Sequence, residues 1–147
     1  MSDPGPGDRA RREFEAFPLH RAMGLSVEEV RPGFARLRME TSAFTLGGAR
    51  GGVHGGLLAA LVDIAMLQAL IPMFRPDEAA AGTADLNITY LRPAMGPRVY
   101  AEANVLRKGR HLAVTEVSVL DQEGRLCAKG RTIYAIQPLE GRPPGPG

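Results

Sequence analysis

A run of apolar residues at positions 55–74, directly after a glycine-rich segment, most constrains the fold of this chain. The run is long enough for a helix of about five turns and is apolar on nearly every face, so we expect a buried core helix. Its only ionisable side chain is Asp63. A buried carboxylate is costly, because desolvation disfavours its charged form. Asp63 is therefore a candidate catalytic residue, and a structural carboxylate held by Ser, Thr or backbone donors is the alternative.

The segments on either side of this helix have the patterns of β-strands. Residues 25–30 and 34–41, joined by a Pro-Gly turn, predict a hairpin, because apolar and charged side chains alternate in its second half. Further strands are expected at residues 82–91, 98–107, 111–120 and 125–136, with turns at 108–109 and 121–124. In the first of these, alternation places Ala84, Leu86, Ile88 and Tyr90 on one face and Thr83, Asp85, Asn87 and Thr89 on the other.

A hairpin, one long apolar helix and then several strands indicate an α+β fold, in which a curved antiparallel sheet wraps around the helix. The length of 147 residues suits one domain, placed at residues 9–140. A short amphipathic helix is expected at residues 9–17. The Pro/Gly-rich tails at 1–8 and 141–147 are expected to be disordered, because they can bury almost nothing.

Charge and cysteine content narrow the class of protein. The net charge of +2 comes from dispersed basic residues, which weakly supports an anionic ligand and argues against a nucleic-acid partner. One cysteine, Cys127, excludes an intrachain disulfide, and no residues have metal-ligand spacing. No signal-peptide pattern is evident, and Pro72 and Asp63 argue against a membrane span. We therefore expect a cytoplasmic protein that has no metal and no membrane partner.

Three segments together resemble a known family. They are VHGG at residues 53–56 with Asp63 nine positions after His54, TADLNITYLRPA at residues 83–94, and the turn KGR at residues 108–110. In this combination the chain resembles the PaaI-like branch of the hotdog-fold acyl-CoA thioesterases over residues 23–136. The resemblance implies the hotdog fold, a sheet curved around a central helix, and hydrolysis of an acyl-CoA thioester.

The resemblance also implies roles for individual residues. The helical carboxylate, here Asp63, acts as general base or nucleophile. The amide at the first helical turn, here Gly55, polarises the thioester carbonyl, and a Ser or Thr on the next strand, here Thr83, assists. The chain departs from the family pattern at Gly48, six residues before His54, where members usually carry Asn or Gln.

The residue types at the start of the helix suit this chemistry. A helix N-terminus offers unpaired N–H groups and the positive end of the helix dipole, and Gly55 and Gly56 let a ligand approach the backbone closely. A tight entry into a packed helix is the alternative for these glycines. His54 either steadies the carbonyl and its donor or only fixes the helix entry, and Thr83 either assists catalysis or is an ordinary strand residue.

The spacing within the helix has a further consequence. Gly55 and Asp63 are eight residues apart, roughly 12 Å along a helix axis. One carboxylate cannot bridge that gap to act on a carbon whose oxygen lies at Gly55. Two copies related by a two-fold axis could place Gly55 of one chain opposite Asp63 of the other. Catalysis therefore requires a homodimer with sites at the interface, and a homotetramer is possible.

Arg107, Lys108 and Arg110 form a basic cluster at a predicted turn. They could bind the phosphates of CoA, which would make them substrate-binding residues, or they could be a solvated basic turn. CoA would enter as part of the substrate, so no separate cofactor is expected.

Acyl-CoA thioesterase is the function that these observations favour. A non-catalytic acyl-CoA-binding module on the same fold is the alternative, which Gly48 supports and Asp63 opposes. A hotdog dehydratase or hydratase fits less well, because those enzymes pair a His and an acid at a different spacing.

Overall fold

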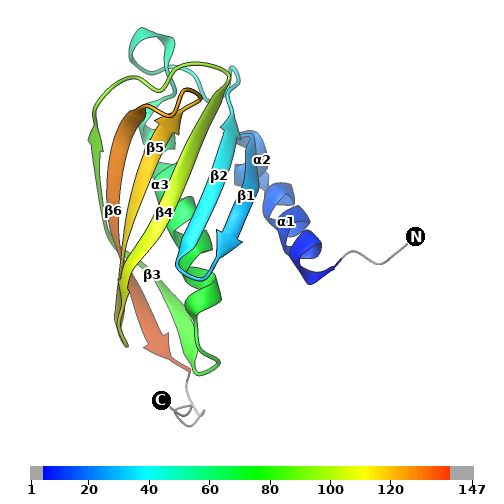
Figure 1. Cartoon of the computed structure of the whole chain (residues 1–147), viewed down its shortest axis with the longest axis vertical. Coiled ribbons are helices and arrows are strands. Elements are labelled where there is room, and N and C mark those ends of the chain that lie inside the picture. Colours follow the sequence, from blue (N-terminus) through cyan, green and yellow to red (C-terminus); the bar gives the residue numbers. More distant parts are fainter. Residues whose placement is uncertain (1–4, 140–147) are drawn as a thin grey trace.

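The computed structural model describes residues 5–139, and in it one antiparallel sheet of six strands curves around one long helix (Figure 1). The strand order is β1-β2-β4-β5-β6-β3, so β1 and β3 form the two edges. The strands are β1 Leu25–Arg31, β2 Phe34–Glu40, β3 Glu78–Tyr90, β4 Arg98–Lys108, β5 Leu112–Asp121 and β6 Leu126–Pro138. The expected α+β architecture and each of the expected strands are confirmed.

The β1–β2 hairpin follows the predicted alternation. Its pairing runs from Leu25 opposite Met39 to Arg31 opposite Phe34. Ala35, Leu37 and Met39 point into the core and are fully buried. The hairpin is therefore stabilised because these side chains share the face that covers the helix.

The central helix α3 spans Gly55–Leu70 and continues as a 3-10 turn, Ile71–Met73. The α-helix stops there because Pro72 has no amide hydrogen to donate. The side of α3 that faces the sheet is buried, but the expectation of burial on nearly every face is wrong for the single chain. Five apolar side chains outside this buried side are only half-buried: Leu57, Ala59, Ala60, Ile64 and Leu67. Asp63 is half-buried as well.

Close contact between α3 and β6 depends on a glycine. A Cβ atom on Gly130 would lie 2.5 Å from Cγ1 of Val62, a separation that real Cβ atoms essentially never show. The absence of a side chain at Gly130 lets the helix rest directly on the sheet, and Val62 is fully buried there. This contact fixes the distance between the helix and the sheet next to Asp63, the residue that follows Val62.

Two short helices, α1 Pro6–Ala16 and α2 Pro18–Ala22, precede the sheet and lie beside β1 (Figure 1). The sequence predicts a helix at 9–17 after a disordered segment at 1–8. The helix instead begins at Pro6, whose fixed φ suits a first helical position, so the expected disorder is wrong from there to Asp8. Residues 1–4 and the expected tail at 141–147 lie outside the described residues.

The edge strand β3 is long and largely uncovered. Its 13 residues pair with β6 on one side only, and Leu86 and Ile88 are the partly buried hydrophobic residues on it that pack against the core.

By length and composition alone, Gly55–Met73 could cross a membrane. In this structure, however, seven side chains of this helix are buried in the core of the protein.

Candidate active site

The start of α3 is held by His54, the residue that caps the helix. Nδ1 of His54 accepts a hydrogen bond from the Gly56 amide at 3.0 Å. The carbonyl of the same residue accepts the amides of Leu57 and Leu58 at 2.9 and 3.2 Å. An accepting Nδ1 belongs to a neutral imidazole with its proton on Nε2. The structure thus places His54 at the helix entry, where its side chain and backbone hold the first turn.

One amide of this first turn is left without an acceptor. Within residues 5–139 the Gly55 N–H donates no hydrogen bond, whereas the next three amides all donate to His54. It lies at the positive end of the helix dipole. A free N–H in this position can donate to an oxygen on which negative charge develops.

A pocket of about 330 Å³ adjoins this amide. Its walls are mostly apolar and include Val53, Leu58, Leu91 and Ala94, together with Gly55 itself. An apolar group of moderate size could therefore occupy the pocket while a carbonyl attached to it reaches the Gly55 amide.

The loop before α3 has no room for a side chain at Gly48, which also lines the pocket. A Cβ atom there would lie 2.5 Å from the Val53 carbonyl oxygen and 3.1 Å from that of Gly52. The amides of Gly47 and Gly48 both donate to the Gly52 carbonyl, at 3.2 and 2.9 Å. The loop is folded so tightly that the Asn or Gln usual in the family does not fit on this backbone.

Asp63 lies on α3 where β3 passes it. Thr83 on β3 donates its hydroxyl hydrogen to Oδ1 of Asp63 at 2.6 Å. Oδ2 accepts no hydrogen bond within the described residues. The carboxylate is therefore held by one oxygen, and the other remains available to a ligand or a water molecule.

Thr83 reaches Asp63 because β3 contains a bulge. Thr83 pairs with Tyr134 and Asp85 pairs with the preceding residue of β6, so Ala84 has no partner in the ladder. The extra residue shifts the alternation, and Thr83 faces the helix together with Leu86. The predicted assignment of these two residues to opposite faces is wrong.

Tyr134 on β6 lies opposite Thr83 and close to the carboxylate. Its side chain is largely buried and its ring contacts Phe74 edge-on. Burial, and then the negative charge of Asp63, raises the pKa of the Tyr134 hydroxyl. The phenol of Tyr134 is thus held in its protonated form in the neighbourhood of Asp63.

The candidate residues do not all meet within one chain. Gly55 and Asp63 lie on the same helix, eight residues apart, which separates them by roughly 12 Å along the axis. The structure brings His54 and Gly56 to the free amide and Thr83 to the carboxylate. In a single chain the candidate residues therefore form two separate clusters, one around Gly55 and one around Asp63, which are called half-sites below.

The basic cluster lies at the turn between β4 and β5. Lys108 forms an ion pair with Glu78 at 2.7 Å, and both side chains are nearly buried. Burial opposes ionisation of Glu78, but the Arg75 amide and Lys108 outweigh it and lower the pKa of this carboxyl. Lys108 thus ties the turn to the start of β3, while Arg107 and Arg110 are exposed.

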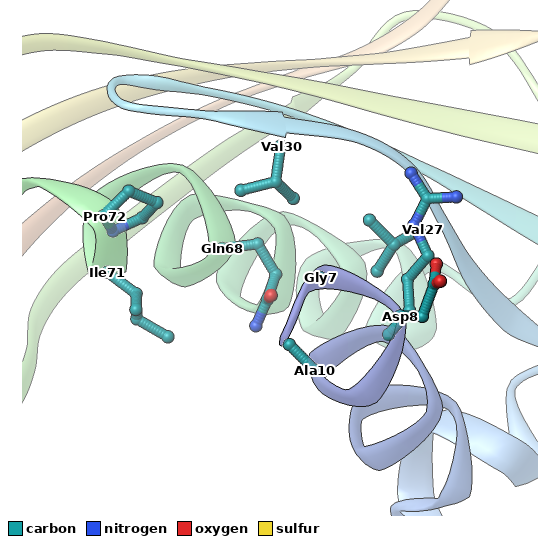
Figure 2. Close-up of a pocket in the computed structure, with 9 residues that line it drawn as sticks. Gly7, Asp8, Ala10, Val27, Val30, Gln68, Ile71 and Pro72 are labelled. Atoms are coloured by element: carbon teal, nitrogen blue, oxygen red, sulfur yellow. The ribbon is translucent and has the colours of Figure 1, made fainter. Parts of the chain in front are cut away.

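A larger pocket, of about 450 Å³, lies at the opposite end of α3 from Gly55 (Figure 2). It is enclosed by α1, by Val27 and Val30 of β1 and by the helix end at Ile71, and Gln68 points toward it.

Among residues 5–139, no group of three His, Cys, Asp or Glu side chains could hold a metal ion.

Comparison with known proteins identifies the family. The thioesterase superfamily matches residues 50–128, more than half of the chain and including both half-sites. The chain belongs to the thioesterase superfamily. It is therefore a thioester hydrolase, and its PaaI-like character and hotdog fold are confirmed by the relatives that follow.

A candidate esterase from Halobacterium salinarum is 39% identical over 125 residues, which cover 78% of this chain and 81% of that protein. The medium/long-chain acyl-CoA thioesterase YigI of Escherichia coli is 29% identical over 81% of this chain and 85% of its own. Among solved structures, a single-residue mutant of the phenylacetic acid degradation protein PaaI from Thermus thermophilus aligns with a TM-score of 0.70 and 30% identity. The alignment covers 81% of this chain and 98% of PaaI.

Sequence reasoning missed one residue at the first half-site. Tyr90, assigned only to the apolar face of its strand, donates its hydroxyl hydrogen to the Gly55 carbonyl at 2.6 Å. A half-exposed tyrosine at the end of a strand carries no sequence signal for such a contact. The position of the strand end beside the helix start is known only from the fold.

Proposed function

We propose that this chain is an acyl-CoA thioesterase whose active site forms between two copies. Asp63 of one copy and the Gly55 amide of the other act on the same thioester. The observation that carries the proposal is the free Gly55 amide at an apolar pocket, on a helix whose only carboxylate is held through a single oxygen.

In this proposal the thioester oxygen accepts the Gly55 N–H, and the acyl group occupies the adjoining pocket. Oδ2 of Asp63 takes a proton from water, and the resulting hydroxide attacks the carbonyl carbon. The oxyanion is stabilised by the Gly55 amide until the C–S bond breaks. The CoA thiolate leaves and receives the proton from Asp63, so the products are the free acid and CoA.

Alternatively, Asp63 attacks the carbonyl carbon itself and forms an anhydride that water then hydrolyses. A single turnover in ¹⁸O-water separates the two routes. If Asp63 is the nucleophile, ¹⁸O-water hydrolyses the anhydride, and attack at the Asp63 carbonyl carbon leaves ¹⁸O in the Asp63 carboxylate. A general base leaves Asp63 unlabelled, and all the label goes to the acid.

The pocket next to Gly55 supports an apolar acyl group. Val53, Leu58 and Leu91 offer no hydrogen-bonding side chain, so they favour burial of hydrocarbon, at about 0.8 kcal/mol per methylene. The E. coli relative YigI, named for medium- and long-chain acyl-CoA, supports an aliphatic substrate.

Two uncovered surfaces support a homodimer. β3 is an edge strand with unpaired backbone groups along one side, which favours pairing with another strand. The outward side of α3 carries apolar side chains that are only half-buried in the single chain, and a partner could cover the rest of their surface. A two-fold axis beside β3 would cover both surfaces and bring the two half-sites together. We therefore propose an obligate homodimer, and a homotetramer would need a further interface between two such dimers.

CoA phosphates are proposed to lie at the β4–β5 turn. Arg107 and Arg110 are exposed and have no ion-pair partner among the described residues, so they can bind an anion. Lys108 is already paired with Glu78, and its part in substrate binding would be to hold the turn in place.

Asp63→Asn tests the catalytic role. This variant keeps the shape of the side chain and an oxygen for Thr83, but it cannot accept a proton, so kcat should fall by at least ~100-fold. Asp85→Asn is the matched control, because Asp85 is exposed and lies on the strand face away from α3. If Asp63→Asn hydrolyses thioesters as fast as the parent, the proposed role of Asp63 is wrong.

Complementation tests the two-chain site. Asp63→Asn is refolded together with Gly55→Pro, which lacks the amide hydrogen, and the folding of each variant is first checked by circular dichroism. Each parent variant should be nearly inactive. A heterodimer would contain one intact site and should recover up to half of the normal activity per dimer. Confirmed heterodimers without activity would contradict the shared site.

A further inference from the structure

Tyr90 contacts the first residue of α3 in two ways. Its hydroxyl donates to the Gly55 carbonyl at 2.6 Å. Its ring lies over the position of the missing Gly55 side chain, since a Cβ atom there would be 3.3 Å from Cζ of Tyr90. The ring and the hydroxyl together fill the space beside Gly55 and cap its carbonyl group.

The peptide group that joins Gly55 and Gly56 is therefore held at both ends. Tyr90 binds its carbonyl oxygen, and Nδ1 of His54 binds its N–H. Two consecutive glycines have more backbone freedom than any other pair of residues. The two side chains remove this freedom at the turn that carries the free Gly55 amide.

We propose that Tyr90 is a positioning residue for the proposed hydrolysis. Its hydroxyl holds the Gly55–Gly56 peptide and so fixes the backbone of Gly55, whose own N–H belongs to the preceding His54–Gly55 peptide and is thereby kept pointing at the thioester oxygen. This inference rests on the proposed function. Tyr90 acts through Gly55, and a donor in this position works only when it is aimed at the oxyanion.

The exposure of Tyr90 supports a role beyond packing. Half of its surface is accessible, and it lines the pocket beside Gly55. A hydrogen bond in contact with water contributes little net stability, because water can replace either partner. The bond therefore matters more for the direction of the helix start than for folding.

Tyr90→Phe tests the inference, since it keeps the ring over Gly55 and removes only the hydroxyl. Removing an oxyanion donor entirely costs about 100- to 1,000-fold, and a misaimed donor should cost less, roughly 10-fold in kcat. KM for acyl-CoA should stay within about twofold, because the bulk of the substrate contacts is unchanged. Tyr100→Phe is the matched control, with its ring on β4 under Arg36 and away from α3.

A fall in kcat of threefold or more, with KM and melting temperature unchanged and Tyr100→Phe fully active, supports the inference. A smaller fall in kcat, or a fall that comes with a comparable change in KM or melting temperature, overturns it. Asp63→Asn, assayed in parallel, separates this failure from that of the proposed function. If Asp63→Asn is inactive while Tyr90→Phe is unimpaired, only the role of Tyr90 is wrong.

Discussion

Replacing Gly48 with asparagine would restore the residue type that is usual in the family, and we predict that it harms the protein. The new Cβ atom at this position would meet the Val53 carbonyl oxygen at 2.5 Å, about 1 Å closer than ordinary contact. Backbone atoms cannot swing aside as a flexible side chain can. The loop itself must therefore move.

The cost can be bounded from the structure. Overpacking of this kind costs about 1–3 kcal/mol, and the loss of glycine's freedom in the unfolded chain returns about 0.4–1 kcal/mol. A net loss of about 1–2 kcal/mol corresponds to a fall in melting temperature of roughly 2–8 °C for a chain of this size. Val53 leads directly into His54, so a shift of about 1 Å would also misplace the Gly55 amide and lower kcat by roughly 10- to 100-fold.

Thermal unfolding and steady-state hydrolysis of an acyl-CoA measure the two effects. Ala49→Asn is the matched control for the melting temperature, because it introduces the same side chain at the next, exposed position of the loop. It should stay within about 0.5 kcal/mol of the parent. If Gly48→Asn raises kcat and leaves the melting temperature unchanged, the loop has room for an amide and the steric argument is refuted.

Three further predictions concern other parts of the molecule. Gly130→Ala should cost about 1–3 kcal/mol in urea unfolding, and Val62→Ala in the same chain should recover part of it by removing the clashing methyls. Arg107→Ala with Arg110→Ala should raise KM for acyl-CoA more than it lowers kcat, and added salt should shrink the difference from the parent. The pKa of Asp121 is lowered overall. Burial alone would raise it, but hydrogen bonds from Arg125 and Glu123 in the same turn outweigh the effect of burial. Its contribution to stability is present above about pH 4 and is lost as pH falls through the lowered pKa, so Asp121→Asn should flatten the acid dependence of unfolding.

Each of these has a clear contrary result. Additive losses in the Gly130 and Val62 double variant would show that the two residues do not clash. Equal losses on acyl-CoA and on a truncated thioester without the nucleotide would show that the basic turn does not bind CoA. An Asp121→Asn chain with the parent's acid profile would place the acid sensitivity elsewhere.

The sequence predicted those parts of the fold in which local pattern and burial agree. Alternation in residues 34–40 is strict, and the side chains that it assigns to the core are buried. In β3 the same rule failed, because the bulge at Ala84 shifts Thr83 and Gly82 to the other face, and a second bulge at Ala81 shifts the alternation again. The available sequence signal of an irregular strand was a glycine inside the strand pattern, Gly82, whose φ in the structure is +123°.

The candidate site was only partly predictable for a related reason. Apolar composition does not distinguish a surface buried by the chain itself from one left for a partner, so α3 was expected to be covered on nearly every side. The residue spacing of Gly55 and Asp63 could be read directly, since a helix has a fixed rise. The contact between Tyr90 and Gly55 could not, because it depends on where a distant strand ends.

The edge strand β3 links assembly to the site. It carries Thr83, which holds Asp63, and Tyr90, which holds Gly55, yet one side of its backbone has no partner strand in the single chain. If a second copy pairs there, dissociation would separate the half-sites and also release the strand that positions them. Specific activity should therefore fall in proportion to the dimer fraction on dilution, followed by sedimentation velocity, while circular dichroism still shows folded chains. Full activity in a folded monomer would refute the shared site, because within one chain roughly 12 Å of helix separates the carboxylate from the amide.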